Sequence, residues 1–344
     1  MRYSGVIFFS AMFFSVFSSA YATRGSFDFD RWNDLQDSVR TAATKDKISN
    51  ETIDATLKSP VFIPRIVYND KNQSEFKLTL NDYLSRTVSS ERVRQGHNMS
   101  KKYPTLLGKT TAKYGVPKHV ILAFWGMESN YGGVKKAYRL KDAFFTLMYD
   151  GRREEFFTKQ LLSLMKTADK NKLDINNIYG SWAGAMGHFQ FIPTTLSQYG
   201  ADGNGDGKID IINNVSDAMF SAGNYLNKLG WNPNERIARK VLIPADFDTG
   251  LINGDKKFAI SQWADKGVLN IDGTPLETSE TVVGLVADGA NDVVSNLVAS
   301  PDNDVEMQSV KVAYLTYPNF YRIKKWNNSN WYAVAIAELS DKLK

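Results

Sequence analysis

The chain has 344 residues, a formal net charge of +5 and no cysteine. The missing cysteine excludes disulfides, a lipid-modified cysteine, thiolate metal sites and thiol nucleophiles. The length allows a sizeable hydrophobic core. The mild positive excess would favour an anionic polymer, but the 42 lysines and arginines form no basic run, so nucleic acid is only a weak alternative as a partner.

The first residues have the pattern of an export signal. Arg2 provides a positive start, residues 6–17 are an apolar run, and Ala20-Tyr-Ala22 is a small-x-small cleavage site. The run is too short to span a bilayer comfortably. We therefore expect a signal peptide over residues 1–22, and a mature periplasmic protein without stable membrane insertion.

After this leader the hydrophobic pattern is mostly helical, with a break at Ser59–Pro64. Apolar periodicity predicts further helices over 153–166, 215–228 and 330–343. Between about 237 and 317, short β-branched runs alternate with Gly/Asp turns, which indicates strands. The sequence thus predicts a mainly α (α+β) fold, a large helical body with a small β-rich module.

Glu128 ends an otherwise apolar helix that begins near Pro117. Val120, Phe124 and Glu128 are spaced i, i+4, i+8, so their side chains share one helix face. Burial on that face would raise the pKa of the carboxyl group, as a general acid working near neutral pH requires. The alternative is a glutamate at a frayed helix end, solvated beyond the apolar stripe.

Other catalytic constellations are missing from the sequence. His97, His119 and His188 are far apart without metal-type spacing. There is no G-x-S-x-G elbow and no phosphate-binding glycine fingerprint. Acid/base chemistry by a carboxylate is what remains.

A second informative segment runs from Gly180 to Pro193. Its small residues would let the backbone approach a ligand closely, and Gln190 offers both a donor and acceptors. Trp182, Phe189 and Phe191 could stack on sugar faces. By composition alone, a tightly packed helix–loop junction explains this segment more simply.

The segment Asp202-x-Asn204-x-Asp206-Gly207-Lys208-x-Asp210 has a calcium-loop spacing. Oxygen ligands fall at positions 1, 3, 5 and 9, with glycine at position 6 for the sharp turn. Asn213 replaces the usual bidentate glutamate, which should reduce affinity. The alternative is a solvated Asp/Gly turn; we expect a structural calcium ion and no organic cofactor.

Taken together, two of these motifs resemble those of the B-type lytic murein transglycosylases, bacterial enzymes that cut the glycan strands of peptidoglycan. The motifs are Glu128-Ser-Asn-Tyr-Gly132 and Gly180-Ser-x-Ala-Gly-Ala-Met-Gly-x-x-Gln-Phe-x-Pro193. The resemblance runs from about Tyr83 to the C-terminus. Further matches are Tyr114-Gly-Val-Pro117, Gly151-Arg-Arg153, Asp202–Gly207, Asn224-Tyr-Leu before Gly230-Trp231, and Asn327-x-Ser329.

The resemblance implies that Glu128 is a single catalytic acid/base, and that Asp217 completes the calcium ligands. It also implies a set of sugar-binding residues, among which Trp326 stands where tyrosine is frequent in the family. That set is Ser181, Gln190, Arg152, Arg153, Tyr83, Trp326 and Asn327. His188 likewise stands at a position that is frequently tyrosine.

The implied fold is a lysozyme-like helical catalytic core with an additional helical region and a small β-rich module. We expect a monomer whose partners are glycan strands and, as candidates, proteins of a wall-remodelling complex. The expected segments are an N-terminal helical region (23–105), the lysozyme-like core with the calcium-type loop (106–235), the β-rich module (236–320), and a strand and helix that return to the core (321–344).

The implied reaction cleaves the bond between N-acetylmuramic acid and N-acetylglucosamine, with the sugar's own C6 hydroxyl closing a 1,6-anhydro ring. Two alternatives stay open. One is a muramidase that cleaves the same bond with water, and the other is a non-catalytic, calcium-stabilised peptidoglycan-binding protein.

Overall fold

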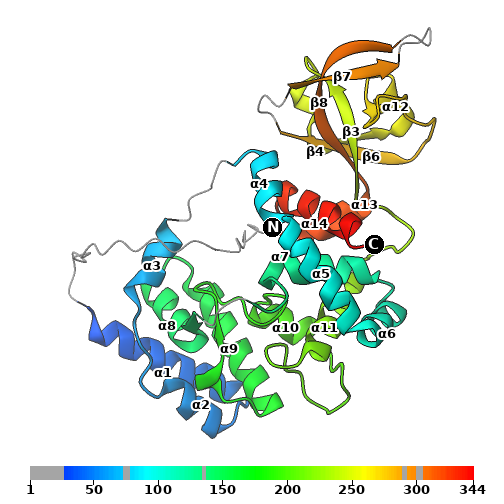
Figure 1. Cartoon of the computed structure of the whole chain (residues 1–344). Coiled ribbons are helices and arrows are strands. Elements are labelled where there is room, and N and C mark those ends of the chain that lie inside the picture. Colours follow the sequence, from blue (N-terminus) through cyan, green and yellow to red (C-terminus); the bar gives the residue numbers. More distant parts are fainter. Residues whose placement is uncertain (1–26, 73–77, 134–136, 289–292, 300–304) are drawn as a thin grey trace. The chain divides into compact units, whose positions relative to one another are not determined.

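The structure is a computed structural model that describes residues 27–72, 78–133, 137–288, 293–299 and 305–344 (Figure 1). The expected signal peptide, residues 1–22, lies outside the described residues. Helices dominate and the sheets are small and antiparallel, which confirms the predicted mainly α fold with a β-rich part. None of the helices in these ranges combines the length and apolar character that a membrane span requires.

The described residues form two compact units, each built from two stretches of sequence. We call 27–72 with 128–225 the first unit, and 78–127 with 226–344 the second unit. The chain passes between the units three times. The first division falls between residues 72 and 78, the second inside helix α7 (Lys118–Ser129), between Met127 and Glu128, and the third inside α11 (Val215–Lys228), between Tyr225 and Leu226. Each unit is described by itself.

The first unit is helical apart from a two-stranded ribbon of β1 (Tyr138–Arg139) and β2 (Tyr179–Gly180). Helices α8 and α9 pack on each other, and α1, α2, α3 and α10 pack on this pair (Figure 1). Their bounds are α1 Phe29–Lys45, α2 Asn50–Leu57, α3 Pro64–Lys71, α8 Leu140–Asp150, α9 Glu154–Asn171 and α10 Pro193–Tyr199. Helix α2 ends before the predicted break at Ser59–Pro64, and α3 begins at the last residue of the break, Pro64.

Buried polar groups of α8 hold the N-terminal segment in place. The fully buried Lys141 amine donates to the carbonyls of Ala55 (3.1 Å), Thr56 (3.3 Å) and Lys58 (2.7 Å), which caps the carboxyl end of α2. On the same helix the Asp142 carboxylate accepts the Val61 N–H at 3.1 Å. The backbone groups that a helix end leaves unpaired are therefore satisfied by side chains instead of water.

In the second unit the helices are α4 Leu80–Thr87, α5 Ser90–Lys102, α6 Pro104–Tyr114, α13 Pro318–Trp326 and α14 Asn330–Lys342, with most of α7. The remainder is a sheet in the strand order β4-β6-β8-β3-β5, with β7 paired to β8 and every pairing antiparallel. Its strands are β3 Ala238–Pro244, β4 Asn253–Ala259, β5 Leu269–Asn270, β6 Val282–Ala287, β7 Val293–Ala299 and β8 Val305–Thr316.

The sheet has its own apolar core around Trp263 of α12 (Ile260–Ala264). The indole is fully buried and its Nε1–H donates to the Val283 carbonyl at 2.9 Å, so its polar edge is satisfied. Strand β6 is buried on both faces from Val283 onward, and for this reason it has a continuous apolar run instead of alternation.

The predicted helix over 215–228 is confirmed residue for residue as α11. Helix α9 is longer than predicted and continues to Asn171. The last turn is polar in sequence, but a tertiary bond stabilises it, because the Asn171 side-chain oxygen accepts the Ile209 N–H at 2.7 Å. Sequence periodicity does not detect such a contact.

Candidate active site

Helix α7 carries Glu128 in its last turn. Val120, Ile121, Phe124 and Trp125 are each at most 1% exposed, which confirms the apolar face predicted for this helix. Glu128 itself is half-buried, so it lies at the edge of that face and is not enclosed within it. A carboxylate in this place can be reached from outside the core.

Ser129, the next residue, joins the two sequence motifs. Its hydroxyl donates to the His188 carbonyl at 2.6 Å and accepts the Gly132 N–H at 2.9 Å, and the residue is only 1% exposed. A buried hydroxyl with both a donor and an acceptor bond is fixed in orientation. The end of α7 is thereby fastened to the turn 187–190, which carries Gln190.

The chain after Ser129 turns sharply and packs on His188. Asn130, Tyr131 and Gly132 have φ values of 48°, 59° and 87°, a left-handed run that glycine tolerates best. A Cβ atom on Gly132 would lie 2.6 Å from two atoms of the His188 ring. Burial lowers the pKa of the His188 imidazole, and the Asp210 carboxylate opposes this only in part, so the ring is neutral at neutral pH.

Gln190 lies in a tight turn of the glycine-rich segment. The turn is closed by two backbone bonds between Met186 and Phe191, at 2.9 and 3.0 Å. Gln190 has a φ of 49° and donates its side-chain amide to the Gly187 carbonyl at 2.9 Å. Its side-chain oxygen makes no hydrogen bond within the described residues, so an acceptor is held in a defined position.

Ser181 closes another turn of this segment. Its hydroxyl accepts the Ala185 N–H at 3.0 Å, and its own N–H donates to the Ala185 carbonyl at 2.8 Å. The Ser181 hydroxyl is therefore an acceptor within its own turn, and its proton remains available for a further hydrogen bond.

Arg152 and Arg153 both reach one carboxylate, that of Asp70 on α3. Sequence reasoning missed Asp70, because it lies in a short helix far along the chain from the arginines and belongs to no motif. The sequence therefore indicated both arginines as candidate binding residues but not the carboxylate that holds them.

Tyr83, Trp326 and Asn327 belong to the second unit, whereas Glu128 belongs to the first. Trp326 is half-buried, and its ring centroid lies 4.7 Å from that of Phe124. Asn327 is 6% exposed and ends α13, and Tyr83 is half-buried on α4. Their membership of one site with Glu128 stays a prediction.

The aspartates of the calcium-type loop bond to backbone amides. Asp202 accepts the N–H groups of Gly205 (2.6 Å) and Gly207 (2.7 Å), while Asp217 accepts those of Gly203 (2.9 Å) and Asp210 (2.8 Å). Within the described ranges, no three His, Cys, Asp or Glu residues are arranged as a metal-binding group. The loop is therefore closed by its own hydrogen bonds.

The donor set nevertheless suits a hard cation, because every candidate ligand offers oxygen. Asp217 is fully buried, and burial raises the pKa of its carboxyl, with the Asp202 carboxylate adding to the effect. Two carboxylates that disfavour each other's charge are an arrangement that a cation would relieve. The loop therefore suits a cation by the chemistry of its ligands, and the cation would relieve Asp202 and Asp217 most directly.

The loop is also tied to the turn 187–190. Ile211, at its end, accepts the His188 N–H at 3.1 Å, and a Cβ on Gly187 would lie 2.5 Å from the same carbonyl oxygen. A continuous chain of contacts thus runs from the loop through Ile211 and His188 to Ser129.

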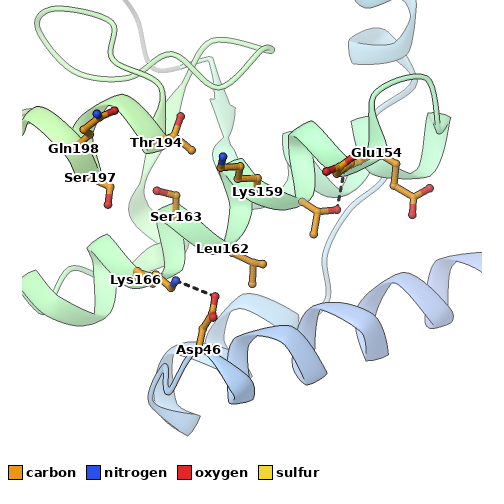
Figure 2. Close-up of a pocket in the computed structure, with 11 residues that line it drawn as sticks. Asp46, Glu154, Lys159, Leu162, Ser163, Lys166, Thr194, Ser197 and Gln198 are labelled. Atoms are coloured by element: carbon orange, nitrogen blue, oxygen red, sulfur yellow. Dashed lines mark hydrogen bonds and ion pairs between the residues drawn. The ribbon is translucent and has the colours of Figure 1, made fainter. Parts of the chain in front are cut away.

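A groove of about 760 Å³ lies elsewhere in the first unit, along α9, α10 and the end of α1. Figure 2 shows its polar lining, in which Lys166 reaches Asp46 at 2.9 Å. None of the predicted site residues lines this groove, so we do not assign the predicted activity to it.

The likenesses of this chain to known proteins agree on one class, the lytic transglycosylases with a lysozyme-like fold. The chain belongs to the transglycosylase SLT domain family, whose profile matches residues 30–341. This confirms the resemblance drawn from the Glu128 and Gly180–Pro193 motifs.

Individual relatives extend this result. The membrane-bound lytic murein transglycosylase B of Escherichia coli K12 is 30% identical over 259 residues, covering 75% of this chain and 65% of that protein. The chain thus spans only part of that relative. SltB3 from Pseudomonas aeruginosa, solved in complex with NAG-anhNAM-pentapeptide, has a TM-score of 0.81 at 33% identity, covering 91% of this chain and 79% of that one. Escherichia coli Slt35, solved in complex with calcium, has a TM-score of 0.73 at 26% identity, covering 91% and 92%.

The contact between Gly132 and His188 leads to a first prediction. Gly132→Ala should destabilise the protein by roughly 2 kcal/mol, since it adds left-handed strain and places Cβ against the imidazole. Thermal and urea unfolding measure this change. Gly108→Ala, in α6 with no atom within 4 Å of the added Cβ, is the control and should not destabilise. Adding His188→Ala to Gly132→Ala should restore part of the loss; a Gly132→Ala protein as stable as wild type contradicts the packing.

Proposed function

We propose that this protein is a peptidoglycan lytic transglycosylase. It cleaves the MurNAc-β-1,4-GlcNAc bond and leaves a 1,6-anhydro-MurNAc end, with Glu128 as its single acid/base. The observation that carries the proposal is the Ser129 hydrogen bond, which holds the helix end with Glu128 against the turn with Gln190. Membership of the transglycosylase family and the likeness to SltB3, a protein solved with an anhydromuramyl ligand, support it.

In the first step the protonated Glu128 carboxyl donates its proton to the glycosidic oxygen, and the bond from C1 of the muramic acid breaks. The muramic N-acetyl group stabilises the positive charge that develops at C1. Glu128 is suited to start as a neutral acid, because the carboxyl end of a helix disfavours negative charge.

In the second step the Glu128 carboxylate removes the proton of the C6 hydroxyl while O6 bonds to C1. The acid is regenerated and no water is consumed. An intramolecular nucleophile needs positioning rather than activation, and good positioning of reacting groups lowers a barrier by several kcal/mol, about 7 or more in the best cases. The free side-chain oxygen of Gln190 and the hydroxyl proton of Ser181 are the groups we assign to orienting the sugar.

We further propose a structural calcium ion at the loop. Its ligands would be Asp202, Asn204, Asp206, Lys208 and Asp210, completed by Asp217. The likeness to Slt35, a protein solved with calcium, supports this assignment. Through Ile211 and His188, calcium would stiffen the turn that carries Gln190; it supplies no acid or nucleophile.

The remaining assignments follow from this function. The lysozyme-like core would cover 106–235, flanked by the helical region 23–105, the β-rich module 236–320 and the returning segment 321–344. The enzyme would act as a monomer in the periplasm on glycan strands, with other wall-remodelling proteins as candidate partners.

The first test replaces the acid while keeping its shape. Glu128→Gln should lower turnover of sacculi by about 10²–10⁴-fold, the usual contribution of a general acid/base, and leave binding to sacculi intact. Glu155→Gln, a change on the exposed side of α9, should digest sacculi like wild type. Mass spectrometry of the wild-type products should find ends lighter by one water than reducing ends.

The same experiment separates the alternatives. Products with only reducing ends would identify a muramidase. Binding without any turnover by the wild type would identify a non-catalytic peptidoglycan-binding protein. Normal turnover by Glu128→Gln would remove Glu128 from the mechanism.

Calcium should stabilise the protein measurably. A ligand at a hundred times its Kd adds about 2.7 kcal/mol to the free energy of unfolding, which thermal unfolding with calcium or with a chelator would detect at pH 7. Burial raises the pKa of Asp217, so the folded state favours its protonated carboxyl. This stabilising contribution is lost as pH rises through the raised pKa, and bound calcium offsets the loss. The calcium increment should therefore shrink as pH falls and Asp217 is protonated.

Two variants control this measurement. Asp202→Asn should abolish the calcium increment. Asp174→Asn, which changes another carboxylate that accepts a local backbone N–H, should keep it. If calcium does not change the thermal unfolding of the wild-type protein at pH 7, the protein has no such site.

Export can be tested on the mature protein. Cleavage after Ala22 predicts that N-terminal sequencing of the periplasmic protein begins at Thr23. A mature protein that retains residues 1–22 would refute the signal peptide.

A further inference from the structure

Positive charge is concentrated in one segment of the second unit. Residues 90–118, which we call the basic segment, comprise helices α5 and α6 and the first residue of α7 (Figure 1). The segment has seven lysines and arginines against a single glutamate, a net charge of +6. The whole chain carries +5, so the rest of the chain carries a net −1. The basic residues are spaced along helices, and for this reason they form no run in the sequence.

The charges lie on the exposed sides of the two helices. In α5, Arg94 and Lys101 are exposed and two turns apart, so their side chains share one side of the helix. In α6, Lys109 and Lys113 are exposed and one turn apart. Gly96 is the only buried residue of α5, so this helix adds little to the core and presents its polar side chains to solvent.

Little of this charge is neutralised within the protein. Arg94 forms a two-point ion pair with Glu91, at 2.7 and 2.8 Å, which uses the only carboxylate of the segment. Four exposed lysines of the segment form no ion pair with a carboxylate of the described residues; they are Lys101, Lys102, Lys109 and Lys118. The first two lie in the last turn of α5, where the helix dipole favours a cation. Lys109 and Lys118 have no such local reason.

The kind of ligand follows from what the segment lacks. A protein exported to the periplasm, as proposed above, meets two anionic surfaces, the headgroups of membrane lipids and the peptide carboxylates of the wall. Binding at a lipid surface is strengthened by apolar side chains that enter the acyl boundary. Among the described residues, the exposed large apolar side chains all lie outside the segment; they are Phe29, Val61, Tyr68, Ile271 and Val282. The segment therefore suits a hydrated anionic polymer, which it attracts by charge alone.

We propose that the basic segment is a retention surface that holds the enzyme on the peptidoglycan network. This inference rests on the proposed function. The network is a polyanion because its stem peptides carry carboxylates, and the exposed lysines would attract many of them without fixing any one. The surface differs from the candidate active site, since none of the predicted site residues lies within 90–118. Its effect would be on binding to intact wall and not on the chemical step.

The test measures binding to intact sacculi by co-sedimentation of the purified mature protein. Glu128→Gln is the parent protein, so that the wall is not digested during the assay. Changing the four lysines together to glutamine (K101Q, K102Q, K109Q and K118Q) should weaken binding about tenfold at low salt, because exposed charges contribute little singly and more as a group. High salt should remove most of this difference, since it screens exposed charges. Sacculi with amidated carboxylates should bind both proteins equally weakly.

A matched control removes the same amount of charge elsewhere. It changes four exposed lysines outside the segment that also form no ion pair with a described carboxylate, namely Lys47, Lys170, Lys256 and Lys266. Both quadruple variants lose four positive charges, so an effect of net charge alone would appear in both. The control should bind sacculi like the parent. With Glu128 intact, the segment variant should cleave short soluble glycan without peptides at the wild-type kcat and KM, and it should unfold at the wild-type temperature.

The outcomes are distinct. If the segment variant binds sacculi as tightly as the parent, or if both quadruple variants lose binding equally, the inference is wrong. Vesicles of anionic phospholipid are the second ligand. If the parent binds them more tightly than sacculi and the segment variant loses that binding, the partner is a membrane and the assignment to the wall is overturned. Co-sedimentation does not depend on turnover, so a wild-type protein that binds sacculi through the segment and cleaves no glycan refutes the proposed function alone.

Discussion

The Ser129 hydroxyl is the contact on which the candidate site depends. It connects the end of an apolar helix to a glycine-rich turn nearly sixty residues later (129 against 188) by donating to one backbone carbonyl and accepting from one N–H. Both partners are backbone groups, so the link depends on the rotamer of Ser129 and on no side chain of its partners. The end of α7 with Glu128 and the turn with Gln190 are then held together, as the proposed catalysis by a single acid/base requires.

Around this link the first unit uses buried polar groups where a simple apolar core would be expected. Lys141 caps α2, Asp142 and Thr146 bind the segment before α3, and Asp70 binds two arginines. Each satisfied group fixes a direction as well as a distance, which apolar packing does not do. The proposed binding of a sugar polymer would gain from elements fixed in this way.

Sequence reasoning reached helices α7, α9, α11 and α14, the presence of strands in the β-rich part and the two motifs, because periodicity and local composition determine them. Helix α11 was predicted residue for residue, and the buried face of α7 was predicted correctly. The sequence left two positions open for Glu128, buried on the apolar face or solvated at the helix end, and the residue is half-buried. Spacing along a helix gives a direction and not a depth. Asp70 could not be predicted at all. It becomes meaningful only when α3 is packed beside α8, and no local pattern in a short polar helix reports that contact.

The composition of the first unit from two separate stretches of sequence has a consequence for biosynthesis. Helices α1, α2 and α3 are made before α8 and α9, against which they pack. Until then Trp32, Leu35 and Val39, which the finished unit buries, lack the cover that α8 and α9 provide. Exposed apolar side chains in an incomplete chain promote aggregation. The leading segment is therefore open to such contacts until residues 128–225 have followed.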